Sequence, residues 1–135
     1  MKIQLAAAAL AAALLSPTMA HAETSQARQL LNNCRTWQAL QYDRDPNADT
    51  IQAMRCSYYV LGALDAANIY EKEAATRRFM FPSGMKRGEI IKAVLAQMET
   101  LAAQEGSRFD QQSGIGITLA AIEMAFPVPA PTTIP

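Results

Sequence analysis

The sequence predicts an all-α fold, a small four-helix bundle-like domain that follows an N-terminal export signal. Apolar residues recur at spacings of three and four along four separate stretches, which is typical of amphipathic helices. Loops rich in Asp, Pro, Gly and Ser separate these stretches. No stretch has the alternating pattern of a strand, and the length of 135 residues favours one domain.

Residues 1–22 have the pattern of a secretory signal peptide. Lys2 provides a positive start, an apolar run covers residues 5–15, and Ala20-His21-Ala22 fits a small-x-small cleavage site. The apolar run is too short to span a bilayer as a helix, so an uncleaved anchor is the less favoured alternative. We expect cleavage after Ala22, a mature domain at residues 23–127 without a membrane span, and a disordered proline-rich tail at residues 128–135.

The composition of the mature chain excludes several classes of function. Loss of Lys2 leaves 11 of the 12 basic residues against 12 acidic ones, so no basic excess would attract nucleic acid. The only histidine, His21, leaves with the signal peptide. Without histidine the chain lacks the commonest general base and metal ligand. We therefore expect no catalytic residues, no metal and no cofactor.

The first predicted helix covers residues 25–40. Thr24 or Ser25 can cap its start. Its apolar positions form one stripe: Ala27, Leu30, Leu31, Cys34 and Trp37. A loop rich in Asp, Pro and Asn follows at residues 42–49, and Asp49 or Thr50 can cap the next helix.

The second predicted helix covers residues 51–74 and contains the most apolar part of the domain, residues 55–70. Its apolar residues fall on more than one face, and a helix that is apolar nearly all round is surrounded by other helices. We therefore expect it to be the central helix. Of its two adjacent tyrosines, Tyr58 and Tyr59, one should pack inside and the other reach the rim.

The two cysteines, Cys34 and Cys56, predict one disulfide between the first two helices. An even cysteine count in an exported chain favours a disulfide. Two free buried thiols are the alternative.

The second half of the chain predicts two more helices. Residues 76–84 break the helical pattern. We expect Phe79 and Phe81 in this segment to close over the core. The alternative is an exposed apolar patch that binds a partner protein. The third helix covers residues 86–104 and stops at Gly106. A polar loop follows at residues 107–113, and the fourth helix, residues 114–125, should turn Ile115, Leu119, Ile122 and the following Phe126 inward.

Two residues of the second helix are candidate buried structural positions. Asp65 stands in an apolar setting, where a carboxylate must be paired or hydrogen-bonded. A catalytic acid pair with Glu123 is the less favoured alternative. Gly62 is suited to close helix contact.

Four residues are candidate partner contacts. Tyr42 and Arg44 lie in the first loop, and Arg108 and Asp110 lie in the polar loop before the fourth helix. Tyrosine and arginine are enriched in interface hot spots. The alternative for both loops is an ordinary solvated turn.

Four motifs in order resemble the Rap/Tai immunity proteins. The first is Leu-Leu-x-x-Cys at residues 30–34, and the second is Cys-x-x-Tyr-x-x-Gly-x-x-Asp-Ala at residues 56–66. The third is FPSGM at residues 81–85 before the third helix, and the fourth is LAAIEMAFP at residues 119–127. The resemblance implies a small secreted helical protein that neutralises a peptidoglycan amidase effector delivered by type VI secretion.

The chain departs from that family pattern at two points. Family members often carry a second cysteine pair where Met80 and Val128 stand here, so we expect a looser tether between these segments. Lys86 stands where the family tends to have a threonine cap.

The leading functional hypothesis is a non-catalytic periplasmic protein that binds and occludes such an amidase. The sequence leaves open whether two copies of the chain form a homodimer. The alternative is a small periplasmic two-cysteine chaperone or stress protein, suggested by the disulfide and the apolar cluster at residues 79–81.

Overall fold

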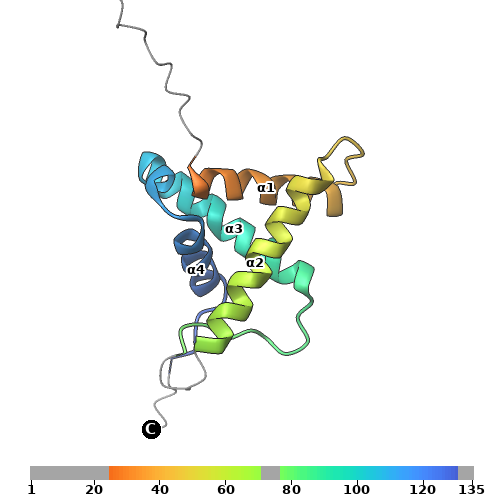
Figure 1. Cartoon of the computed structure of the whole chain (residues 1–135). Coiled ribbons are helices and arrows are strands. Elements are labelled where there is room, and N and C mark those ends of the chain that lie inside the picture. The colour runs from red at the N-terminus through yellow and green to blue at the C-terminus, as the bar shows by residue number, and fades with distance from the viewer. Residues whose placement is uncertain (1–24, 71–76, 131–135) are drawn as a thin grey trace, which may run out of the picture.

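The computed structural model describes residues 25–70 and 77–130. These residues form four α-helices and one 3-10 helix (Figure 1): α1 (Gln26–Gln41), α2 (Thr50–Tyr70), α3 (Arg87–Glu105), η2 (Gly106–Gln111) and α4 (Gly114–Ala125). The predicted all-α class is confirmed. The expected signal peptide, the last part of the expected tail and the expected end of the second helix lie outside the described residues.

Three helices begin with the side-chain caps that their sequences favour. The Ser25 hydroxyl accepts the Arg28 N–H at 3.2 Å at the start of α1. A carboxylate oxygen of Asp49 accepts the N–H groups of residues 51 and 52 at 2.8 and 3.1 Å at the start of α2. The Ser113 hydroxyl accepts the Gly116 N–H at 3.1 Å at the start of α4. Each cap satisfies backbone donors that have no partner inside the helix.

The start of α3 uses a different device. Lys86 has no acceptor on its side chain. Instead, the Glu89 carboxylate accepts the Lys86 backbone N–H at 2.8 Å, which is one half of a capping box. Gly106 ends α3 with a positive φ of 56°, as predicted, because glycine adopts this conformation without strain.

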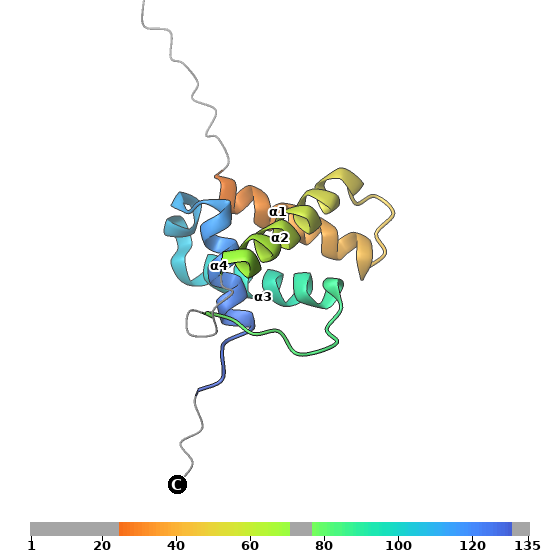
Figure 2. The ribbon, with the colours of Figure 1, turned by 60° about the horizontal axis from the view of Figure 1, so that its bottom comes forward.

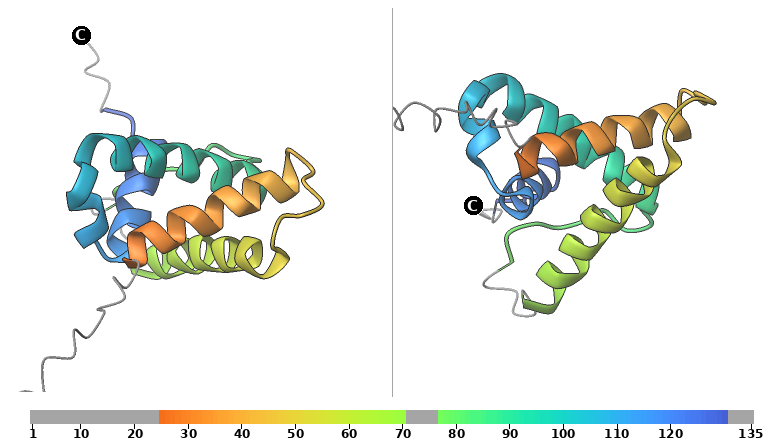
Figure 3. Two further views of the ribbon diagram at one scale, coloured as in Figure 1. Left: turned by 90° about the horizontal axis from the view of Figure 1, so that it is seen from above. Right: turned by 45° about the horizontal axis from the view of Figure 1, so that its top comes forward.

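The core is organised around α1, which contacts α2, α3, α4 and η2. Seen from above, α1 crosses between α3 and α2 (Figure 3, left). Its predicted stripe is confirmed, because all five residues are buried: Ala27, Leu30, Leu31, Cys34 and Trp37. Helix α3 supplies the facing side with Ile91, Val94, Leu95, Met98 and Leu101.

Helix α2 is not the central helix, so that prediction was wrong. It buries one face of mostly small residues: Ala53, Cys56, Val60, Ala63, Leu64 and Ala67. The opposite face is exposed, with Ile51 at 64% and Tyr58 at 68% of full accessibility. Helix α2 is therefore apolar on several faces because part of its exposed surface is apolar, and not because other helices surround it.

Asp65 and Gly62 lie on the exposed face of α2, so both predictions of a buried structural position were wrong. Asp65 is exposed. Gly62 is exposed as well, and a Cβ atom added there would meet nothing within 4 Å. Gly62 and Asp65 follow Tyr58 by four and seven positions, which places all three residues on one side of the helix.

The expected polar loop at residues 107–113 is largely the 3-10 helix η2. Its Phe109 is fully buried, and the Arg28 guanidinium lies 5.0 Å from the centre of that ring. The inward face of α4 also differs from the prediction. Ile122 is buried as expected, but Ile115 is 43% exposed and Ile117 and Thr118 take the inward positions.

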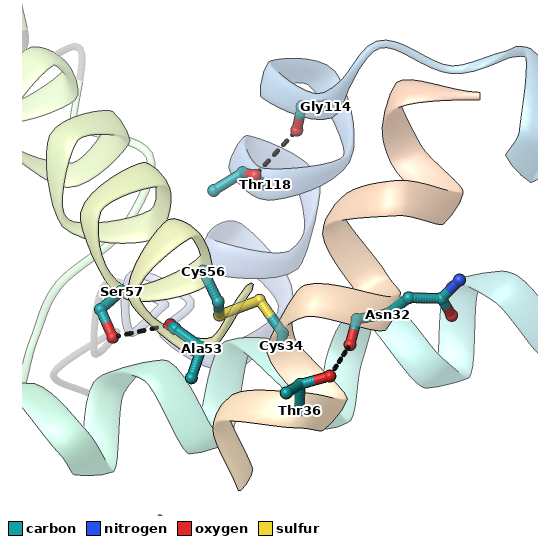
Figure 4. Close-up of a disulfide and its surroundings, with 8 residues drawn as sticks. All are labelled: Asn32, Cys34, Thr36, Ala53, Cys56, Ser57, Gly114 and Thr118. Atoms are coloured by element: carbon teal, nitrogen blue, oxygen red, sulfur yellow. Dashed lines mark hydrogen bonds between the residues drawn. A yellow bond between two sulfur atoms is a disulfide. The ribbon is translucent and has the colours of Figure 1, made fainter. Parts of the chain in front are cut away.

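The disulfide between Cys34 and Cys56 joins α1 to α2 (Figure 4). The two Cα atoms are 4.9 Å apart, and the side chains are 1% and 0% exposed. This confirms the predicted pairing, which uses both cysteines of the sequence.

Aromatic rings attach the segment after α4 to the segment before α3. The Met80 N–H donates to the Phe126 carbonyl at 2.9 Å, beside a bridge between Phe79 and Pro127. The Phe81 ring lies 5.2 Å from the Phe79 ring and 4.7 Å from the Phe126 ring. Phe79 is 4% exposed, so the prediction that it closes over the core is confirmed. These contacts join the two segments where the second family disulfide is missing.

The described chain leaves the bundle on two opposite sides. Helix α1 starts on one side, and the stretch after α4 runs away from the other (Figure 2). Among the described residues, no helix is both long and apolar enough to cross a membrane.

Candidate functional site

Three carboxylates of the described residues lie in surface ion pairs with arginines. Within residues 25–70 and 77–130, no group of three or more His, Cys, Asp or Glu side chains could hold a metal ion. Glu123 accepts from Arg78 at 3.0 Å. Two other surface ion pairs are Arg28–Asp110 at 2.8 Å and Arg35–Glu99 at 3.0 Å. Such exposed pairs contribute little to stability, typically about 0–1 kcal/mol each.

An open groove with a volume of about 750 Å³ lies between α1 and α2. The two helices meet near their connecting loop and diverge toward the start of α1, and α4 lies in the opening (Figure 3, right). The α1 wall consists of Gln26, Gln29, Leu30 and Asn33. The α2 wall consists of Arg55, Tyr58 and Tyr59, and Gly114 of α4 completes the lining.

Helical periodicity explains why these residues share a groove. The α1 residues follow one another at i, i+3, i+4 and i+7, and the α2 residues at i, i+3 and i+4, so each set lies on one helix face. Asn33 precedes Cys34, and Arg55 precedes Cys56. The disulfide therefore fixes the separation of the two walls at this point.

The two tyrosines of the groove have different surroundings. Tyr58 is 68% exposed and projects into solvent, whereas Tyr59 is 40% exposed. The Tyr59 hydroxyl rests on α4, 2.7 Å from where a Cβ atom would stand on Gly114. Partial burial raises the pKa of Tyr59 above its ordinary value of 10.0, because desolvation disfavours the charged phenolate. Neither ring enters the core, so the expectation that one of them packs inside was wrong.

Comparison with known protein families identifies the family of the chain. The model of the Rap1a immunity proteins matches residues 26–128. The chain belongs to the Rap1a immunity family. It is therefore an immunity-type protein, and membership implies a secreted effector protein as its partner. Among curated proteins and among solved structures, none matches the chain.

The groove lies within the part of this Rap1a-family chain that the family model covers, from Gln26 to Gly114. We did not predict it from the sequence. The available signal was the Arg-x-x-Tyr-Tyr spacing at residues 55–59, which places three interface-prone side chains on one helix face. The apolar residues around this motif led instead to the prediction of a buried helix.

The four predicted partner contacts of the Rap1a-family chain do not form one surface. Tyr42 lies just beyond the end of α1, 44% exposed, with its ring centre 5.6 Å from that of Trp37. Arg44 lies nearby with a φ of 53°, a backbone conformation that residues other than glycine rarely adopt. Arg108 and Asp110 lie in η2, and the Arg28–Asp110 pair places them near the start of α1. The two pairs are therefore at opposite ends of α1.

Proposed function

We propose that this Rap1a-family protein is a non-catalytic periplasmic inhibitor of a peptidoglycan amidase effector delivered by type VI secretion. The family match over residues 26–128 carries the immunity role. The choice of an amidase comes from the resemblance of the four sequence motifs to Rap/Tai proteins. Inhibition would occur by binding the effector and covering its catalytic cleft.

Two features support a periplasmic location. The N-terminal sequence has the charge, apolar run and Ala-His-Ala site of a signal peptide. The Cys34–Cys56 disulfide also suits an oxidising compartment.

The groove between α1 and α2 is the surface that we propose as the main contact. Its α2 wall combines two tyrosines with an arginine, and these residue types dominate the binding energy of many interfaces. Tyr42 and Arg44 at one end of α1, and Arg108 and Asp110 at the other, are proposed as secondary contacts.

The chaperone alternative loses one of the observations that suggested it, the exposed apolar cluster expected at residues 79–81, while the disulfide that also suggested it is present. Phe79 is buried, and Phe81 packs against Phe79 and Phe126. Of the three residues only Met80 is exposed, at 42%.

The decisive experiment mixes the purified mature protein with a type VI peptidoglycan amidase effector, beginning with any amidase that a neighbouring gene encodes. We expect a stable complex by isothermal titration calorimetry and loss of peptidoglycan cleavage at equimolar protein. Light scattering of the complex gives the number of copies of each chain. The mature protein alone should leave peptidoglycan uncleaved. If the amidase neither binds nor loses activity, the proposed function is wrong.

A further inference from the structure

Arg55 is the one charged residue that lines the groove between α1 and α2. It is exposed and makes no ion pair with another described residue. The two arginines of α1 differ from it, because Arg28 is held by Asp110 and Arg35 by Glu99. The groove therefore presents a guanidinium whose donors are free to bind a carboxylate in a bidentate manner.

The rest of the lining suits a segment of polypeptide. On one wall, Tyr58 and Tyr59 offer rings for apolar contact, with exposures of 68% and 40%. On the other wall, Gln26, Gln29 and Asn33 carry amides that both donate and accept hydrogen bonds. Such amides match the N–H and C=O groups of an extended chain, which need partners when they are taken out of water.

We propose that the groove receives a projecting loop of the effector, and that an aspartate or glutamate of this loop forms an ion pair with Arg55. This inference rests on the proposed function. At this contact the immunity protein would provide the concave surface, and the effector would provide the projecting one.

The first test compares charge reversals inside and outside the groove. Arg55→Glu should weaken binding of the effector by about 30-fold or more, the loss expected when a paired interfacial charge is removed. Arg55→Lys keeps the charge without the fork geometry and should bind between the wild type and Arg55→Glu. Arg87→Glu is the matched control, because Arg87 is exposed at the start of α3 and does not line the groove. It should change the dissociation constant by less than about threefold.

The second test restores the pair with its charges exchanged. Each exposed carboxylate on the effector's loops is changed to lysine in turn, and each variant is titrated against Arg55→Glu. One of them should recover at least about tenfold of the lost affinity, whereas the same variant should bind the wild type weakly. Circular dichroism of every variant shows whether its helices are intact.

Three outcomes would contradict the inference. If the wild type binds the effector but Arg55→Glu and Tyr58→Ala bind equally well, the groove assignment is wrong while the proposed function stands. If the wild type binds no effector, both are wrong. If a soluble peptidoglycan fragment shifts the amide NMR signals of Arg55 and Tyr58 while the effector leaves them unchanged, the groove binds saccharide, and the loop assignment is wrong.

Discussion

The Tyr59 hydroxyl of α2 lies 2.7 Å from the position that a Cβ atom would take on Gly114, the first residue of α4. A side chain at position 114 would therefore collide with the tyrosine. The absence of a Cβ atom lets Tyr59 lie against α4, and this contact sets the shape of the groove at that point.

We predict that Gly114→Ala separates binding from stability. The colliding atoms belong to the far end of the Tyr59 side chain, which can move away. The free energy of unfolding should therefore change by less than about 1 kcal/mol, since alanine is also the better helix former. Affinity for the effector should fall about tenfold as Tyr59 moves into the groove. Urea unfolding and calorimetric titration measure the two effects.

The matched control for this variant is Gly62→Ala on the exposed face of α2. A Cβ atom there meets nothing within 4 Å, so the change should stabilise the protein by about 0.5–1 kcal/mol and leave affinity unchanged. A loss of stability in Gly114→Ala of several kcal/mol would show that Tyr59 cannot move, contrary to this prediction.

Removal of the disulfide should destabilise the domain substantially. The bond closes a sequence separation of 22 residues, and restriction of the unfolded chain over such a loop contributes about 3 kcal/mol. Urea unfolding of the Cys34→Ala/Cys56→Ala double variant, and of the wild type with and without dithiothreitol, measures this difference. Equal unfolding midpoints for all three samples would contradict the prediction.

Phe109→Ala should be among the most damaging single changes, because the ring is fully buried beneath Arg28. Truncation of a buried phenylalanine costs about 3–5 kcal/mol through lost burial and a residual cavity. The neighbouring Arg108→Ala should cost less than about 0.5 kcal/mol, since Arg108 is exposed. Thermal and urea unfolding of both variants test the prediction. A similar loss in both would indicate that η2 does not contribute a distinct anchor to the core.

Tyr59 should make the free energy of unfolding depend on pH in alkaline solution. Its pKa is raised by burial above 10.0, so the unfolded chain releases the phenol proton first as the pH rises. The folded state then binds more protons than the unfolded state, and stability falls as the pH passes from 10 through the folded pKa. Below pH 10 this contribution is constant.

Denaturant unfolding between pH 8 and pH 11.5 tests this prediction with Tyr59→Phe and Tyr58→Phe. The pH-dependent loss should shrink only in Tyr59→Phe, because phenylalanine has no proton to release. The exposed Tyr58 is the control at the adjacent position. Identical pH profiles for the wild type and Tyr59→Phe would contradict the assignment.

The sequence was sufficient to predict the helices and the disulfide because these depend on local signals. The stripe from Ala27 to Trp37 has a clear helical period, and all five of its members are buried. Asp49 and Ser25 cap the helices that they were expected to cap. The helical spacing placed Cys34 on the buried side of α1, where it meets Cys56.

The position of α2 and the candidate site could not be predicted in the same way. The apolar residues of α2 do not reveal which of its faces the other helices cover, because coverage depends on the directions of α1, α3 and α4. Phe109 was missed for the same reason. It stands among polar residues, and only the packing of η2 against α1 shows that it belongs to the core.

The ring contacts among Phe79, Phe81 and Phe126 have a consequence for copies that never reach an oxidising environment. These contacts contain no sulfur, so thiol reductants leave that end of the molecule joined while they break the covalent link between α1 and α2. A freshly translated, reduced chain would keep its C-terminal segment in place and lose only the covalent hold on the two walls of its groove.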